Sequence, residues 1–158
     1  MERNNTKNCN LLMAIEQIVE KAKDSQLSKD YLRKVAKHLK YMSDKLELTK
    51  EQSLMLALFI NKSDSNRIEL GDLGEYAKCS TARLLKYSND IETLEKREFI
   101  RCCRDSRSHK SISYRVPYDV IEAIKHDRKY APRDNKNLSC QELFGELDSL
   151  FELRKDNE

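Results

Sequence analysis

The first 46 residues carry hydrophobic positions at helical spacing. The apolar positions are Leu11, Leu12, Ile15, Ile18, Val19 and Ala22, and after a polar break Leu32, Val35, Ala36, Leu39 and Met42. Recurrence every three or four residues predicts two amphipathic helices. Because the break, Asp24–Gln26, is short, we expect the two helices to pack as a hairpin. Their apolar stripes favour a core, or a seam between two subunits, over a ligand site.

A central helix is predicted from Thr49 to about Asn61. Thr49 and Gln52 have the spacing of a capping box, in which each side chain accepts from a free backbone N–H at the helix start. The helix is apolar nearly all round, so we expect it in the middle of the fold. After the polar residues SDSN, Arg67–Leu70 could form a short strand and Gly71–Lys78 a second helix.

A helix-turn-helix is predicted next, because a Cys-Ser turn is followed by a helix that Ser80 can cap. We expect Leu84, Leu85, Ile91 and Leu94 to face inward, and Thr81, Arg83 and Lys86 to lie on the open side. Ser88, Asn89 and Asp90 each favour caps over helix interiors. We therefore expect a short helix followed by a separate one.

Two short alternating runs follow and predict a β-hairpin. Ile100 and Cys102 alternate with Arg101 and Cys103, and on the return Ile112, Tyr114 and Val116 alternate with Ser111, Ser113 and Arg115. The polar tip between the runs spans residues 105–110. Pro117 ends the second strand, because proline cannot donate to a ladder, and a further helix is expected to end near Lys129.

The C-terminal residues combine an apolar stripe with negative charge. A polar linker, 131–137, precedes Ser139 and Glu142, which again have capping-box spacing. The predicted helix carries Leu143, Phe144, Leu147, Leu150 and Phe151 on one side. Residues 138–158 hold six acids and two bases, a net charge of −4. The stripe could pack on this chain or on a partner.

Charge and composition narrow the function. The net charge is +3, yet residues 96–115 hold seven bases and two acids, or +5, so the remainder sums to −2. Positive charge concentrated in one segment is typical of a phosphate-binding surface. Three Gly and two Pro argue against a large sheet with tight turns, so we expect a mainly helical fold with a small β-hairpin.

Several function classes are disfavoured. The five cysteines contain no C-x-x-C pair and the three histidines have no metal-ligand spacing, so we expect no metal and no cofactor. No catalytic set or Gly-rich phosphate loop occurs, which favours a non-catalytic protein. The N-terminus MERNNTKNCN lacks the pattern of a secretory signal, and the longest apolar run, Leu54–Ile60, is too short for a bilayer. We therefore predict a cytoplasmic protein without membrane contact.

The chain resembles the winged-helix superfamily over roughly Leu48 to Tyr130, in the stretches IELGDLGEYAKCS, IETLEKREFIR and SISYRVP. More narrowly, LLKYSNDIETLEKREFIR, SYRVPYDVIEAI and NLSCQELFGELDSLFELR look similar to the N-terminal region of AAA-type ATPases of Bacteroidetes. This resemblance implies a winged helix placed before an ATPase core that is missing here, so we expect no ATP hydrolysis. Glu98 stands where the superfamily often has Gly.

The expected organisation is an N-terminal helical hairpin (1–46), a winged helix-turn-helix domain (47–130), and a linker with an acidic C-terminal helix (131–158). Double-stranded DNA is the first expected partner, with the helix from Ser80 in the major groove. The expected DNA-binding residues are Thr81, Arg83 and Lys86 on that helix, and Arg101, Arg104, Arg107, His109 and Lys110 on the hairpin or wing.

A second hypothesis makes the chain a protein-interaction module. It would dock a partner through the N-terminal hairpin or the acidic C-terminal helix. Salt separates the two hypotheses, because DNA affinity falls steeply with ionic strength while an apolar interface barely responds. The N-terminal helices could also pair two copies of the chain as a homodimer.

Overall fold

The computed structural model describes residues 10–104 and 112–132. Helices dominate this part of the chain, and its strands form a single antiparallel hairpin. Buried residues from Leu11 to Tyr130 belong to one hydrophobic cluster, so the N-terminal helices share a core with the segments that follow them. Among the described residues, no helix is both long and apolar enough to cross a membrane.

The predicted N-terminal hairpin forms, with a difference in its second arm. Helix α2 spans Leu11–Ala22, and Asn10 caps it by accepting from the backbone N–H of Met13 at 2.9 Å. The second arm is two helices, α3 (Lys29–Lys34) and α4 (Ala36–Leu46), instead of one. They meet at Val35, which is fully buried and leaves helical geometry. Tyr31 holds α3 against α2 by donating to the carbonyl of Ile18 at 2.7 Å.

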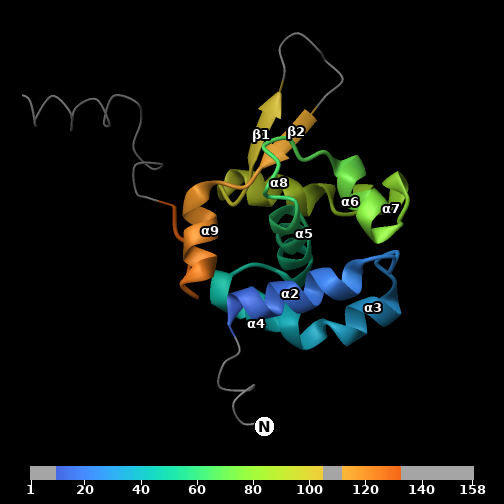
Figure 1. Ribbon diagram of the computed structural model, residues 1–158, viewed down its shortest axis with the longest axis horizontal. Coiled ribbons are helices and arrows are strands. Elements are labelled where there is room, and N and C mark those ends of the chain that lie inside the picture. The colour runs from blue at the N-terminus through green and yellow to red at the C-terminus, as the bar shows by residue number, and fades with distance from the viewer. Residues whose placement is uncertain (1–9, 105–111, 133–158) are drawn as a thin grey trace, which may run out of the picture.

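Helix α5 (Lys50–Asn61) is central, as its sequence predicts. Thr49 and Gln52 form the capping box, and every residue from Ser53 to Phe59 is buried. Figure 1 shows α5 between the helices of the N-terminal hairpin below it and the β-hairpin above it. It therefore links the two ends of the core.

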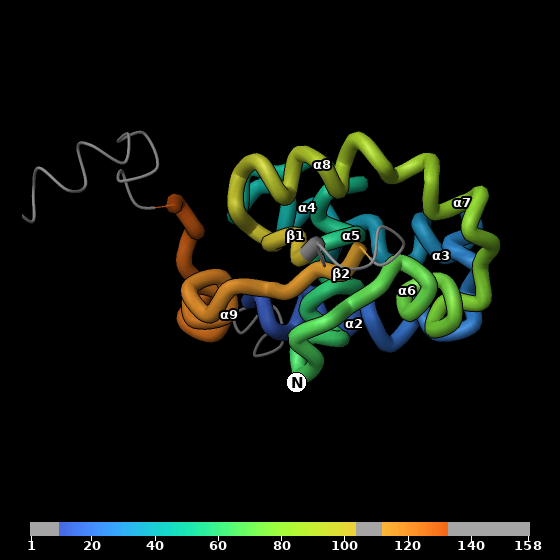
Figure 2. The backbone as a smooth tube through the Cα atoms, turned by 90° about the horizontal axis from the view of Figure 1, so that it is seen from above, coloured from blue at the N-terminus to red at the C-terminus, as the bar shows by residue number. Residues whose placement is uncertain are grey.

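The rest of the chain has the order of a winged helix-turn-helix fold. Helices α6 (Leu70–Ala77), α7 (Thr81–Leu85) and α8 (Ser88–Lys96) are followed by strands β1 (Arg101–Arg104) and β2 (Ile112–Arg115). The short strand expected before α6 is reduced to one bridge, in which Ile68 and Tyr114 exchange two backbone hydrogen bonds of 2.8 Å. Figure 2 shows α7 at the opposite end of the molecule from the last described helix, α9.

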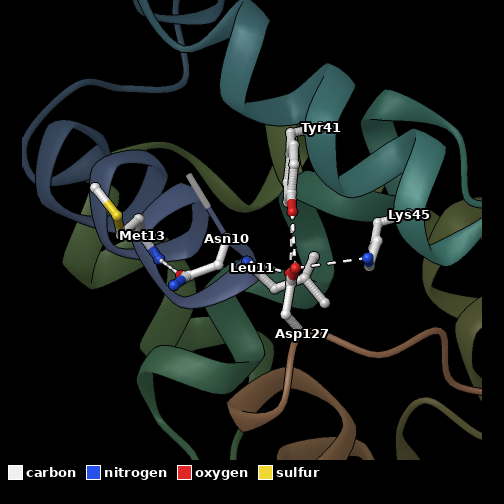
Figure 3. A network of polar contacts seen from close by, with 6 residues as sticks. All are labelled: Asn10, Leu11, Met13, Tyr41, Lys45 and Asp127. Carbon is white, nitrogen blue, oxygen red and sulfur yellow. Dashed lines mark hydrogen bonds and ion pairs between the residues drawn. The ribbon is translucent and has the colours of Figure 1, made fainter. Parts of the chain in front are cut away.

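Helix α9 (Tyr118–Lys125) ends four residues before the predicted Lys129. The chain turns at Asp127, which has a left-handed φ of 52°. Its carboxylate accepts from the backbone N–H of Leu11 at 2.9 Å and from the Tyr41 hydroxyl at 3.0 Å, and pairs with Lys45 at 3.5 Å (Figure 3). Asp127 thus joins the end of α9 to the start of α2 and to α4. The predicted C-terminal linker beyond Pro132 and the acidic helix lie outside the described residues.

Candidate nucleic-acid interface

Gly74 in α6 packs against α7 and against the turn that joins the two helices. A Cβ at this position would lie 3.1 Å from Cδ1 of Leu84 and 3.2 Å from the carbonyl oxygen of Cys79. The turn closes through Lys78, at a left-handed φ of 61°, and through the bond from the Cys79 N–H to the Gly74 carbonyl at 3.0 Å. A side chain at this position would require Leu84 and the Cys79 carbonyl to shift by a few tenths of an ångström, so glycine favours the close approach of α6 and α7. A glycine inside a predicted helix is the sequence signal for such a position, because it costs about 1 kcal/mol relative to alanine.

Helix α7 presents its first turn to solvent. Ser80 caps it by accepting from the backbone N–H of Arg83 at 3.2 Å, as predicted. Thr81 and Lys86 are exposed and Leu84 is buried. Leu85, expected to face inward, is 58% exposed, and that prediction is wrong. A five-residue helix offers the core one stripe, and Leu84 occupies it.

Arg83 lies differently from its neighbours on α7. Its guanidinium donates to the backbone carbonyls of Gln26 at 2.9 Å and Leu27 at 3.5 Å. Both carbonyls belong to the connection between α2 and α3, where Gln26 and Leu27 have left-handed φ values of 58° and 51°. Arg83 is therefore half-buried and turned toward the N-terminal hairpin instead of the open side. Its base-reading role stays a prediction.

The predicted break after α7 is present. Helix α7 ends at Leu85 and α8 begins at Ser88, whose hydroxyl donates to the Leu85 carbonyl at 2.7 Å. Tyr87 lies at the junction and is half-buried. Burial, and then the nearby carboxylates of Glu51 and Asp90, raise the pKa of the Tyr87 hydroxyl. Two short helices, α7 and α8, therefore occupy this stretch in place of one long helix.

The outward side of α8 is not basic. Glu92, Glu95 and Lys96 border a groove of about 460 Å³ that α8 shares with Leu70 and Tyr114. Lys96 pairs with Glu92 at 3.6 Å, which offsets the one positive charge there. A polyanion is thus better accommodated at α7 than along α8.

The strand register places two arginines directly opposite each other. Arg101 pairs with Arg115 across the hairpin, so both side chains leave the same face of the sheet. Both are exposed, and among the described residues no carboxylate forms an ion pair with either. Tyr114 lies on the other face, with its ring 5.3 Å from that of Phe59. Directly opposed like charges destabilise a hairpin, and a bound anion would relieve this repulsion.

Arg115 was missed as a site residue, although the alternation of the two runs could have paired it with Arg101. The alternation itself is incomplete near the tip. Ile112, expected to share the inward face of Tyr114, is 48% exposed, and Ser113 is buried and donates to the Cys103 carbonyl at 3.4 Å. Near the tip of the hairpin, the burial of a side chain therefore does not follow from the face of the strand on which it lies.

The remaining predicted site residues are placed only in part. Arg104 ends β1 opposite Ile112 in the register. Arg107, His109 and Lys110 lie outside the described residues. Figures 1 and 2 place α7 at one end of the long axis and the hairpin nearer the middle, so the two predicted groups of basic residues belong to separate parts of the surface.

Glu98 occupies the position that closes α8 and has a left-handed φ of 58°. This is the conformation that favours glycine after the end of a helix. The backbone N–H of Phe99 still donates to the Leu94 carbonyl at 2.9 Å, so the helix ends in the usual way despite the larger residue.

The described residues hold no group of three or more side chains suited to a metal ion. Cys79, Cys102 and Cys103 are free thiols and partly buried. Burial raises the pKa of the Cys79 thiol, which keeps it protonated and unreactive at neutral pH.

Comparison with known proteins yields similarity to solved structures alone. No protein-family model and no curated protein matches the chain. A MepR mutant from a multidrug-resistant S. aureus clinical isolate is 15% identical with a TM-score of 0.42, over 84% of this chain and 99% of that chain. A selenomethionine derivative of another such mutant is 15% identical (TM-score 0.38; 84% and 99%). S. aureus MepR bound to ethidium bromide is 18% identical (TM-score 0.38; 84% and 98%).

Proposed function

We propose that this chain is a non-catalytic DNA-binding module that contacts duplex DNA through both ends of α7 and through the β-hairpin. The observation that carries the proposal is the opposed pair Arg101 and Arg115, exposed and without a described carboxylate partner. Thr81 and Lys86 add an exposed hydroxyl and a cation on α7. Arg and Lys provide phosphate contacts, which supply most of the affinity for duplex DNA.

The roles within this interface differ. Thr81 and Lys86 face the bases, while Arg101 and Arg115 bind phosphate, together with Arg104 and the predicted wing residues Arg107, His109 and Lys110. Arg83 positions α7 by its two bonds to the connection between α2 and α3. Movement of the N-terminal hairpin would therefore be transmitted to α7.

A salt-dependent titration with random-sequence duplex tests the proposal. We expect Arg101→Ala/Arg115→Ala to weaken binding and to reduce the slope of log K against log salt by about 1.8, since each phosphate contact contributes about 0.9. Lys34→Ala/Lys37→Ala is the matched control, because it removes two exposed charges from the side of the molecule opposite the hairpin (Figure 1). Equal slopes for wild type and the arginine variant would contradict the proposal.

A protein-interaction module is the second candidate, and one observation favours it. Leu12 and Met13, adjacent on α2, are 47% and 37% exposed. Such a surface could dock a partner or a second copy of the chain, with an affinity that barely depends on salt. The ATPase context, the cytoplasmic location and the domain boundaries stay predictions.

A further inference from the structure

A groove with an apolar floor lies on the side of the molecule formed by α3, α4 and α5. It has a volume of about 290 Å³, and its floor consists of Leu32, Ala36, Leu39 and Leu54. Tyr87, at the junction of α7 and α8, closes part of it. The groove is therefore large enough to hold a few apolar side chains from another segment.

The border of this groove is mainly basic. Arg33, Lys50 and Glu51 line it. Residues 29–40, which form α3 and the start of α4, hold five bases and one acid, a net charge of +4. The acid, Asp30, pairs with Arg33 at 3.8 Å, and both side chains are at least 80% exposed, so the pair is weak.

The positive charge extends over α4 beyond the residues that line the groove, as the surroundings of His38 show. Burial, and then the charges of Lys37 and Lys21, lower the pKa of its imidazole. An occupant of the groove should thus be acidic, with apolar side chains on one face.

We propose that the chain's own residues 138–158 bind in this groove. Their net charge of −4 complements the +4 of residues 29–40, and Leu143 and Leu147 stand one helical turn apart in the predicted helix. These leucines fill the apolar floor, while Glu142, Glu146 and their acidic neighbours face Arg33 and Lys50.

The chain can reach the groove from the end of the described residues. Nζ of Lys129 lies 2.8 Å from Oε1 of Glu47. Glu47 is three residues before Lys50, which is at most about 11 Å of extended chain. Residues 131–138 can span at most about 28 Å. Binding within one molecule therefore needs no rearrangement of the described core.

The occupant would contact Tyr87 and so the connection between α7 and α8. This proposal does not rest on DNA binding, and its test contains no nucleic acid. The test is zero-length carbodiimide cross-linking of the full chain at low concentration, followed by mass spectrometry of the peptides. We expect cross-links from the carboxylates of 142–152 to Lys50 and to the lysines of α4. The contact between Glu47 and Lys129 should cross-link as well and serves as an internal control.

The test uses two variants of the contact and a mixture of isotopically labelled and unlabelled chains, which distinguishes cross-links within one chain from cross-links between two chains. Ala36 is exposed on the groove floor, so Ala36→Glu adds a repelling charge without disturbing the core, and Ala36→Ser is its small neutral control. We expect Ala36→Glu and Leu143→Ser/Leu147→Ser each to lower the cross-link yield about tenfold, while the Glu47 to Lys129 product and Ala36→Ser stay unchanged. The proposal would be overturned if no such cross-links form, or if neither variant changes their yield. It would also be overturned if cross-links form only between differently labelled chains, because the occupant would then be a second copy of the chain.

Discussion

The carboxylate of Asp127 connects three elements far apart in sequence, and its removal should weaken the fold by a calculable amount. It accepts from the backbone N–H of Leu11 and from the Tyr41 hydroxyl, and pairs with Lys45 (Figure 3). The side chain is 33% exposed, so we take about 1 kcal/mol for each hydrogen bond and about 0.3 kcal/mol for the ion pair. The contacts therefore contribute about 2 kcal/mol to the free energy of unfolding.

The left-handed φ of Asp127 adds a second contribution. Alanine tolerates this conformation less well than aspartate, at a cost of about 1 kcal/mol, and glycine has no such cost. We expect Asp127→Ala to lower the free energy of unfolding by about 3 kcal/mol and Asp127→Gly by about 2 kcal/mol. Asp127→Asn keeps an acceptor oxygen and should lose about 1 kcal/mol.

Urea unfolding of the full chain measures these differences, with Tyr41→Phe completing a double-mutant cycle. We expect a coupling energy between Tyr41 and Asp127 of about 1 kcal/mol. Equal losses for the alanine and glycine variants would refute the backbone part of this reasoning. A loss below about 1 kcal/mol for Asp127→Ala would refute the contacts themselves.

Three further predictions concern single positions. Gly71→Ala should stabilise α6 by up to about 1 kcal/mol, because alanine has the higher helix propensity and its Cβ would meet no atom within 4 Å. Gly74→Ala should destabilise the protein, because its Cβ would lie close to Leu84 and the Cys79 carbonyl. Calorimetry of the two variants separates the effect of helix propensity from the effect of these close contacts. The pKa of His38, lowered by burial and by neighbouring lysines, should lie below 6.5 in an NMR titration. With a lower pKa in the folded state, the unfolded chain binds more protons as pH falls below 6.5, so the free energy of unfolding decreases. His38→Gln removes this group, and we expect the variant to lose less stability than wild type over the same pH range. An equal loss in both proteins would contradict this. Lys78→Gly should stabilise by about 0.5–1 kcal/mol at its left-handed φ, while Lys40→Gly in the exposed part of α4 should destabilise by about 1 kcal/mol; the same sign for both would refute the backbone argument.

The features that the sequence predicts correctly depend on local interactions. The capping box of Thr49 and Gln52 and the cap at Ser80 join residues three apart, so neighbouring letters are enough to identify them. The amphipathic stripe of α2 and the alternation that pairs the two strands also depend on short repeats. The order of helix, turn, helix and hairpin follows from these signals.

Contacts between elements far apart in sequence determine which charged and polar side chains remain available to a partner. Arg83 binds carbonyls 56 and 57 residues away, and Asp127 binds an N–H 116 residues away, and neither partner leaves a trace in the nearby sequence. The same reason explains why Leu84 is buried and Leu85 exposed, and why Val35 is buried and Ala36 exposed. Packing against distant elements determines which of two neighbouring apolar residues is buried. Hydrogen bonds along a helix are encoded by neighbours, whereas contacts between elements exist only after the core has brought those elements together.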